Sequence, residues 1–246
     1  MIRYKITIEY DGSKYAGWQI QKDEISIEET IQKAIFKLSQ EEVRIFGSGR
    51  TDAGVHALGQ VAHFDLNKEF RPFEIMMGLN YHLKQNEKIA IIDCQIADKE
   101  FHSRFDTKLR HYQYRILNRR AQPILEENRV WHIPYELDIK EMENAASYLI
   151  GQHDFTSFRD SECQAKSPIK TIENIDIIKY DNLILINICA PSFLHHMVRN
   201  IVGTLVMAGG KKITDEKVKQ ILEARNRNKS GPNAPACGLY LYKVDY

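Results

Sequence analysis

Apolar and polar residues alternate strictly at the start of the chain. Apolar side chains occupy every second position up to the Asp11-Gly12 turn, at Ile2, Tyr4, Ile6, Ile8 and Tyr10. This period of two predicts a half-buried strand. The pattern changes to helical spacing at Ser26-Ile27-Glu28-Glu29, a capping box. The elements predicted in the first half are a strand over 2–10, a helix from Ser26, a short strand over 43–46, a strand over 60–66, a helix from Pro72 and a strand over 89–96.

This β-α-β-β-α-β order is that of a ferredoxin-like unit, and the second half of the chain resembles a repeat of it. The elements predicted there are a strand over 110–117, a helix from Asp138 that stops near Gly151, a hairpin of strands over 169–180 and 183–190, a long helix from Leu194 to Gly209-Gly210, a helix over 214–224 and a strand over 239–244. The sequence therefore predicts an α+β protein with two ferredoxin-like (RRM-like) halves, residues 1–103 and 104–246. We expect the two antiparallel sheets to join edge to edge, with a cleft between the helical layers.

Composition is that of an ordinary soluble globular protein, with 246 residues, 43% hydrophobic and 27% charged. No apolar run approaches the roughly 20 residues that cross a bilayer, and the first residues do not resemble a signal peptide. The four cysteines lie far apart and form no C-x-x-C pair, which is compatible with a reducing cytoplasm. The net charge is only +1, so composition alone does not indicate a nucleic-acid partner.

The stretch from Gly47 to His56 (GSGRTDAGVH) is polar and rich in glycine, and it lies between two predicted strands. Its glycines allow sharp turns, and its small residues let another molecule approach the backbone closely. The stretch holds one carboxylate, Asp52, and one guanidinium, Arg50. The alternative interpretation is a plain turn, in which Asp52 caps the backbone and Arg50 is solvated.

The strongest cluster of positive charge spans residues 104–120 and is interleaved with Tyr112 and Tyr114. Its cations are Arg104, Lys108, Arg110, Arg115, Arg119 and Arg120. Cations attract phosphates, and aromatic rings stack on unpaired bases. An exposed strand with salt bridges on one face and core tyrosines on the other explains the same pattern. The smaller basic groups at 211–212 and 225–229 are expected to be solvated helix ends.

Arg199 lies among apolar residues on the long predicted helix, so we expect its guanidinium to be buried beside an anionic partner. Any carboxylate could supply that partner in a structural ion pair. His195 and His196 would point about 100° apart on a helix, and without a third ligand a metal site is disfavoured. The chain contains neither a phosphate-binding P-loop nor a convincing dinucleotide-binding motif.

Five segments in order along the chain resemble the motifs of the TruA family of tRNA pseudouridine synthases. They are Tyr15–Gln21 (YAGWQIQ), Gly49–Ala57 (GRTDAGVHA), FHSR at 101–104 with RHYQY at 110–114, Phe193–Asn200 (FLHHMVRN) and Pro235–Leu241 (PACGLYL). The resemblance covers nearly the whole chain. Two positions depart from the family pattern, with Lys84 in place of a proline and Lys170 in place of an arginine. A lysine at 170 offers a point charge where arginine offers a planar fork.

The resemblance implies two ferredoxin-like halves that flank a central basic cleft. It further implies that the protein isomerises uridine to pseudouridine at positions 38, 39 and 40 of the tRNA anticodon arm. On this basis we expect a cytoplasmic homodimer that uses no cofactor and no metal. The expected partner is tRNA, with no membrane and no nucleotide cofactor.

The resemblance also implies a role for individual residues. Asp52 would be the nucleophile that attacks a uridine flipped out of its stem. Arg199 is the candidate for a cation that pairs with Asp52 and keeps it ionised. The residues expected to bind the substrate are Tyr112, which would stack on the uracil, Arg50, which would contact the RNA backbone or fill the space left by the base, and Arg104 and Arg110, which would hold phosphates.

Two other functions compete with this interpretation. The first is a non-catalytic RNA-binding protein with two RRM-like halves, although the RNP1 motif of such domains is absent from the sequence. The second is a metal-dependent hydrolase that uses His63, His195 or His196 together with Asp52.

Overall fold

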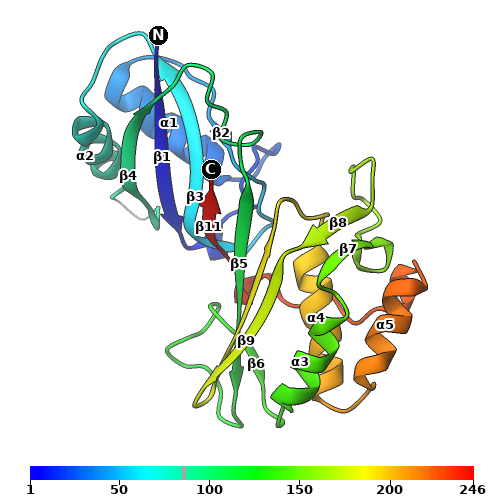
Figure 1. Ribbon diagram of the computed structural model, residues 1–246. Helices are drawn as coiled ribbons and strands as arrows, with labels where there is room; N and C mark the ends of the chain where they lie inside the picture. The colour runs from blue at the N-terminus through cyan, green and yellow to red at the C-terminus, as the bar shows by residue number, and fades with distance from the viewer. Residues whose placement is uncertain (85–86) are drawn as a thin grey trace. The chain divides into compact units, whose positions relative to one another are not determined.

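The computed structural model of the protein describes residues 1–84 and 87–246. It is a mixed α+β structure, which confirms the predicted class (Figure 1). The chain divides into two compact units, and each is described by itself below. Unit 1 comprises residues 1–108 and 240–246, and unit 2 comprises residues 109–239.

Unit 1 is a sheet with two helices. Its elements are β1 (Ile2–Tyr10), α1 (Ile27–Ser39), β2 (Phe46–Gly47), β3 (His56–Leu66), α2 (Pro72–Leu83), β4 (Ile89–Ala97) and β11 (Leu239–Asp245), with a short 3-10 helix η1 (Gly12–Lys14) after β1. The strands lie in the order β4-β1-β3-β11, and β2 pairs with β3. β1 is antiparallel to both neighbours, whereas β11 is parallel to β3, with Tyr240 opposite His56.

The core of unit 1 follows the predicted periodicity. The four apolar residues of β1 from Tyr4 to Tyr10 are at most 2% exposed. In α1 the buried side chains are spaced helically, and the Ser26 hydroxyl accepts a hydrogen bond from the Glu29 N–H at 3.2 Å. Both helices therefore begin as predicted, because capping and Pro72 at a first helical position are local signals.

Two strand boundaries in unit 1 differ from the prediction. The strand predicted over 43–46 is wrong, because β2 pairs with β3 only at Phe46 and Gly47. β3 begins at His56, four residues before the predicted start at Gln60. The early start arises because Ala57 and its neighbours pair with β1 and β11.

Unit 2 combines strands β5 (Leu109–Asn118), β6 (Trp131–Ile133), β7 (Gly151–Asp154), β8 (Ile169–Ile172), β9 (Asn174–Tyr180) and β10 (Leu183–Ala190) with helices α3 (Ile139–Ser147), α4 (Met197–Gly209) and α5 (Asp215–Glu223). Three 3-10 helices connect these elements, η2 (Thr156–Phe158), η3 (Arg227–Lys229) and η4 (Ala236–Gly238). β10 lies between β5 and β9 and is antiparallel to both. β7 and β8 form a separate two-stranded sheet.

Three predictions in unit 2 needed correction. The predicted hairpin forms, but its first strand is divided into β8 and β9 because β8 pairs with β7. α3 ends at Ser147, and Gly151 starts β7 with a φ of +101°. α4 begins at Met197, because His196 adopts a left-handed conformation with a φ of 59° that breaks helical geometry.

In residues 1–84 and 87–246 we find no helix that has both the length and the hydrophobicity of a membrane span.

Candidate active site

Asp52 lies in the loop between β2 and β3 of unit 1, and the start of this loop is bound to β3. The Ser48 N–H donates to the Val61 carbonyl at 2.7 Å, and the Ser48 hydroxyl hydrogen-bonds the Gln60 side chain at 2.6 Å. The Gln60 amide in turn donates to the Gly49 carbonyl at 2.8 Å. Ser48 and Gln60 are both fully buried, so these bonds are shielded from water and hold the loop where it leaves β2.

The residue before Asp52 is fixed from the other side by β1 and the segment that follows it. The Thr51 carbonyl accepts a hydrogen bond from the Trp18 N–H at 3.0 Å, and the Thr51 hydroxyl lies 2.8 Å from the Tyr10 hydroxyl. Gly17 has a φ of +105°, and a Cβ atom there would lie 2.5 Å from the Thr51 carbonyl oxygen. Glycine is therefore required at 17, both for its backbone conformation and for this close approach.

The residues after Asp52 are fixed as well. The Val55 N–H donates to the Asp52 carbonyl at 3.1 Å, which closes a turn through Gly54. Next to it, His56 Nδ1 accepts a hydrogen bond from the Gly12 N–H at 3.1 Å, and the His56 ring stacks on Tyr240 with centroids 4.7 Å apart. The backbone is thus held on both sides of Asp52, whose side chain is half-buried and can reach a ligand.

A second carboxylate, Asp11, lies beside this turn. Its Oδ1 lies 3.4 Å from His56 Nδ1, and its Oδ2 accepts a hydrogen bond from Lys88 at 3.0 Å. Burial acts to raise the pKa of Asp11, but hydrogen bonds from Ser13 and Lys88 outweigh it and hold the pKa well below its usual range. Asp11 is therefore ionised at neutral pH.

Arg50 and Arg104, the other predicted residues of unit 1, are both exposed. Arg50 is in the Asp52 loop, two residues before Asp52, and Arg104 is in the turn between β4 and β5. Exposed guanidinium groups are suited to contacts with phosphates, as predicted for Arg104.

Tyr112 and Arg110 lie on the same face of β5 in unit 2, and both contact the segment that leads into α4. The Tyr112 ring meets the Phe193 ring edge-on, with centroids 5.2 Å apart, and Tyr112 is 8% exposed. The Arg110 guanidinium donates to the Pro191 carbonyl at 2.5 Å. Tyr114, which the sequence grouped with Tyr112, is fully buried and donates to the Pro235 carbonyl at 2.7 Å. Tyr114 is thus a core residue.

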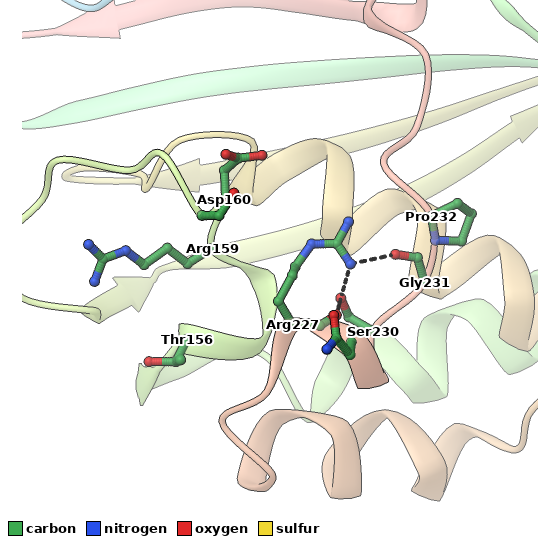
Figure 2. Close-up of a pocket in the computed structure, with 9 residues that line it drawn as sticks. Thr156, Arg159, Asp160, Arg227, Ser230, Gly231 and Pro232 are labelled. Atoms are coloured by element: carbon green, nitrogen blue, oxygen red, sulfur yellow. Dashed lines mark hydrogen bonds between the residues drawn. The ribbon is translucent and has the colours of Figure 1, made fainter.

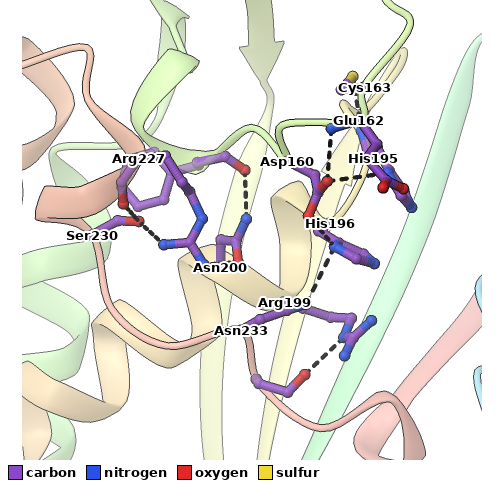
Figure 3. A network of polar contacts seen from close by, with 12 residues as sticks. Asp160, Glu162, Cys163, His195, His196, Arg199, Asn200, Arg227, Ser230 and Asn233 are labelled. Atoms are coloured by element: carbon purple, nitrogen blue, oxygen red, sulfur yellow. Dashed lines mark hydrogen bonds and ion pairs between the residues drawn. The ribbon is translucent and has the colours of Figure 1, made fainter.

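Arg199 lies in the first turn of α4 and is half-buried (Figure 3). Its Nε–H donates to the Ala234 carbonyl at 2.7 Å, and its own carbonyl accepts from the Ala234 N–H at 3.2 Å. These two bonds with one residue fix the direction of the Arg199 side chain.

The two histidines just before α4, His195 and His196, both contact the carboxylate of Asp160. His196 Nδ1 lies 2.7 Å from one Asp160 oxygen, and His195 Nδ1 lies 3.9 Å from the other. Burial acts to raise the pKa of Asp160, but the Glu162 N–H and the His196 ring donate hydrogen bonds that hold this pKa below its usual value. The left-handed backbone at His196 brings both rings to the same carboxylate, which the prediction of two histidines on one helix did not anticipate.

Arg227 is wrongly predicted as a solvated helix end. Its guanidinium donates to the side-chain oxygen of Asn200 at 2.8 Å, to the Ser230 hydroxyl at 2.7 Å and to the Gly231 carbonyl at 3.0 Å. Asn200 is fully buried in α4 and also donates to the Phe158 carbonyl at 2.9 Å. The group therefore ties three separate segments of unit 2 together (Figure 3).

A polar pocket of about 730 Å³ lies beside this network (Figure 2). It is lined by Thr156, Arg159, Asp160, Ser161, Arg227, Asn228, Ser230, Gly231 and Pro232. Arg159 donates to the Cys163 carbonyl at 2.5 Å, and its guanidinium extends away from Arg227 in Figure 2. Residues of both charge signs line the pocket, since Asp160, Arg159 and Arg227 are all among its lining residues.

The predicted residues are thus divided between the units. Asp52, Arg50 and Arg104 belong to unit 1, and the structure holds the first two on one anchored loop. Tyr112, Arg110 and Arg199 belong to unit 2, where the first two share the 191–193 segment. Sequence reasoning missed the supporting residues Thr51, Asp160, Asn200 and Arg227. The one available signal was Asn200, a polar residue among the apolar residues of a helix.

Comparison with known proteins gives one consistent result. The family model described as tRNA pseudouridine synthase matches residues 6–106 and 145–246. A curated protein of Wolbachia pipientis wMel named tRNA pseudouridine synthase A is 50% identical over 246 residues, which is 100% of both chains. A protein of the same name from Ehrlichia ruminantium (strain Gardel) is 49% identical over 246 residues, again 100% of both chains.

Among solved structures, a chain of "Crystal Structure of a Cbf5-Nop10-Gar1 Complex" aligns with a TM-score of 0.32 and 11% identity. The alignment covers 82% of this chain and 53% of that chain, and the likeness is too low to inform the fold.

The family model and both full-length relatives describe one class of enzyme, an isomerase. The chain belongs to the tRNA pseudouridine synthase family, and the predicted resemblance to TruA is confirmed.

Proposed function

We propose that this protein isomerises uridine to pseudouridine in the anticodon arm of tRNA, at positions 38, 39 and 40, with Asp52 as the nucleophile. Family membership supports the reaction and the RNA substrate. The observation that carries the assignment of Asp52 is its position in a loop held on both sides, by Trp18 at the Thr51 carbonyl and by Val55 at its own carbonyl. A half-buried carboxylate on a rigid loop is pre-organised to attack a bound substrate.

The reaction moves one bond within one nucleoside. The bond between uracil N1 and ribose C1′ breaks, the uracil turns, and a bond forms between uracil C5 and the same C1′. The proton that leaves C5 is balanced by one taken up at N1, so neither an oxidant nor an energy source is consumed. This balance agrees with the expectation that no cofactor takes part.

The substrate uridine must leave its stack before Asp52 can reach it, at a cost of a few kcal/mol. Asp52 attacks the flipped nucleoside and is later released when the new carbon–carbon bond has formed. In this proposal Tyr112 lies against the uracil, and Arg50 contacts the RNA backbone or fills the space left by the base. Arg104 and Arg110 hold phosphates of the arm.

Arg199 supplies the cation that keeps Asp52 ionised. Support comes from its two hydrogen bonds with Ala234, which fix the stem of the side chain and aim its terminal nitrogens. Replacement of Arg199 by glutamine should then raise the pH at which turnover falls on the acid side, because a carboxylate without its cation has a higher pKa. An unchanged acid limb would contradict the pairing.

The proposed enzyme consists of two ferredoxin-like halves, residues 1–103 and 104–246, joined through their sheets around a central basic cleft. The β-α-β-β-α-β order of unit 1 supports the first half. We further propose that the enzyme works as a homodimer in the cytoplasm, where its tRNA substrate is found. The four cysteines, all within the described part of the chain, form no disulfide, in agreement with a reducing compartment.

The test uses unmodified tRNA with uridines in the anticodon arm, purified protein, a chelator and no added cofactor. Pseudouridine is mapped by position for the wild-type protein, for Asp52→Asn and for Asp181→Asn, an exposed aspartate at the tip of the β9–β10 hairpin. We expect pseudouridine only in the anticodon arm, lost with Asp52→Asn and retained with Asp181→Asn. Tight tRNA binding without any pseudouridine would favour the non-catalytic RNA-binding protein, whereas pseudouridine formed in the presence of the chelator would contradict the metal-dependent hydrolase.

A further inference from the structure

Phe105 is a large aromatic residue that unit 1 holds in solvent. Its side chain is 75% exposed, in the turn between β4 and β5. The ring packs against the His102 ring on one side, with centroids 4.3 Å apart and planes inclined by 39°. A single exposed apolar side chain is common on protein surfaces, but Phe105 is distinguished by the ring contacts that hold it and by the cation beside it.

The turn that carries Phe105 is rigid. The N–H groups of Phe105 and Asp106 both donate to the His102 carbonyl, at 3.1 and 3.0 Å. The His102 N–H donates to the Asp106 carboxylate at 2.8 Å, and the Arg104 N–H donates to His102 Nδ1 at 3.1 Å. The Phe105 ring is therefore presented at a fixed angle, and little conformational entropy is lost when a flat ligand binds it.

Below Phe105 the aromatic packing continues into the core. His102 meets His63 edge-on at 4.8 Å, and His63 stacks on Phe46 at 5.1 Å with an interplanar angle of 15°. Burial lowers the pKa of His63 to about 4, so this ring is neutral at physiological pH. Phe105 is the exposed end of a continuous series of tilted, edge-on and stacked ring contacts that reaches the sheet.

Arginine side chains lie against two rings of this series. The Arg104 guanidinium lies 5.9 Å from the Phe105 centroid, and the Arg44 guanidinium lies 4.9 Å from the Phe46 centroid. A flat ring beside guanidinium groups matches an unpaired nucleotide, in which a base stacks on the ring while the phosphate meets the cation.

We propose that Phe105 is a stacking platform for an unpaired base of the tRNA substrate, and that Arg104 binds the adjoining phosphate. The platform lies outside the Asp52 loop and contributes to substrate binding, and it has no part in the chemical step. It rests on the proposed function in one respect, that tRNA is the substrate.

The test measures equilibrium binding of unmodified tRNA to Asp52→Asn protein, so that the substrate is not converted. On this background Phe105→Ala should weaken binding about 5- to 50-fold, as expected for the loss of one stacked base. Phe105→Tyr should restore most of the affinity, whereas Phe105→Leu should not, because leucine is apolar but cannot stack. Phe73→Ala is the matched control, since Phe73 is 64% exposed on α2 of the same unit.

Salt dependence separates the two parts of the platform. Arg104→Gln should reduce the slope of log affinity against log salt concentration by the amount expected for the loss of about one phosphate contact. Phe105→Ala should leave this slope unchanged. Thermal unfolding of every variant shows whether the fold is retained, and Phe105→Tyr and Phe105→Leu remain informative if Phe105→Ala is unstable.

Two outcomes would overturn the platform. One is unchanged tRNA affinity in Phe105→Ala, and the other is full recovery with Phe105→Leu. If the affinity is unchanged and the oligomeric mass of the free Phe105→Ala protein differs from that of its parent, the ring is instead a protein–protein contact. A parent protein that fails to bind tRNA at all would instead contradict the proposed function.

Discussion

The hydroxyl groups of Tyr10 and Thr51 lie 2.8 Å apart inside unit 1, immediately before the candidate nucleophile Asp52. Tyr10 ends β1 and is 2% exposed, and Thr51 is 7% exposed, so water does not compete for this bond. The bond joins the end of β1 to the loop that carries Asp52. It is a direct link between the packing of the sheet and the position of Asp52.

Removal of this bond should affect stability and turnover together. Tyr10→Phe and Thr51→Val should each lower the free energy of unfolding by about 1–2 kcal/mol, because each leaves a buried hydroxyl with one partner fewer. Turnover should fall about tenfold through misplacement of Asp52. Denaturant unfolding of both single variants and the double variant gives the coupling energy, expected to be about 1 kcal/mol. Strictly additive losses would mean that the two hydroxyls do not interact.

Gly17→Ala should damage the Asp52 loop more than a glycine substitution elsewhere. Its Cβ would lie 2.5 Å from the Thr51 carbonyl oxygen, so the loop must move as well as accept a strained backbone. We expect a loss of about 2–3 kcal/mol in stability and a fall in kcat of at least tenfold.

Gly151→Ala is the matched control for Gly17→Ala. Gly151 has a similar φ of +101°, but its nearest contact for a Cβ would be the His153 ring at 3.5 Å. This variant should lose about 1 kcal/mol of stability with no change in kcat. Equal effects of the two substitutions on kcat would show that the close approach at Thr51 is unimportant.

Arg227→Lys should destabilise unit 2 although the charge is kept. Lysine cannot reproduce the fork that reaches Asn200, Ser230 and Gly231, so the buried Asn200 oxygen loses a donor. The expected loss is about 2–3 kcal/mol in chemical unfolding. Arg225→Lys, whose partner is Asp154 at 3.3 Å and whose side chain is 69% exposed, should change stability by less than about 0.5 kcal/mol. A neutral effect at Arg227 would refute the network.

His63 should make the protein less stable in mild acid. The unfolded chain protonates this histidine near pH 6.5, but burial lowers the pKa in the folded protein to about 4. The unfolded state therefore binds more protons between these values, so stability falls as the pH drops from 6.5 toward 4, by about 2 kcal/mol. The slope of unfolding free energy over this window should decrease in His63→Gln and persist in His153→Gln. An unchanged slope in His63→Gln would assign the acid sensitivity to other groups.

The local sequence pattern was sufficient to predict most of the helices and strands. β1, α1 and α2 begin where alternation, the capping Ser26 and Pro72 place them, because these signals act within a few residues. The family motifs likewise identified Asp52, Arg199 and Tyr112 as candidates from their neighbours in sequence. The errors occur where a distant partner decides the outcome, as at β2, which pairs with β3 only at Phe46 and Gly47 although the apolar pattern begins at Val43.

The hydrogen-bond partners of buried polar residues also cannot be predicted from the local sequence. The sequence indicates that Asn200 lies among apolar neighbours, but it does not indicate that Arg227 supplies its hydrogen bond from 27 residues away. Arg227 was therefore taken for a solvated charge. Its neighbours along the chain give no sign of burial, because the partner comes from another helix.

The sequence by itself determined the period of each strand and helix, the small and flexible residues of the Asp52 loop, and the family to which the chain belongs. Only the tertiary structure decided that β11 lies parallel to β3, that Tyr10 meets Thr51, and that the His63 ring meets the His102 ring. The physical reason is the range of the interactions. Periodicity and capping depend on residues within one or two turns, whereas strand partners and buried hydrogen bonds depend on which distant segments share one core.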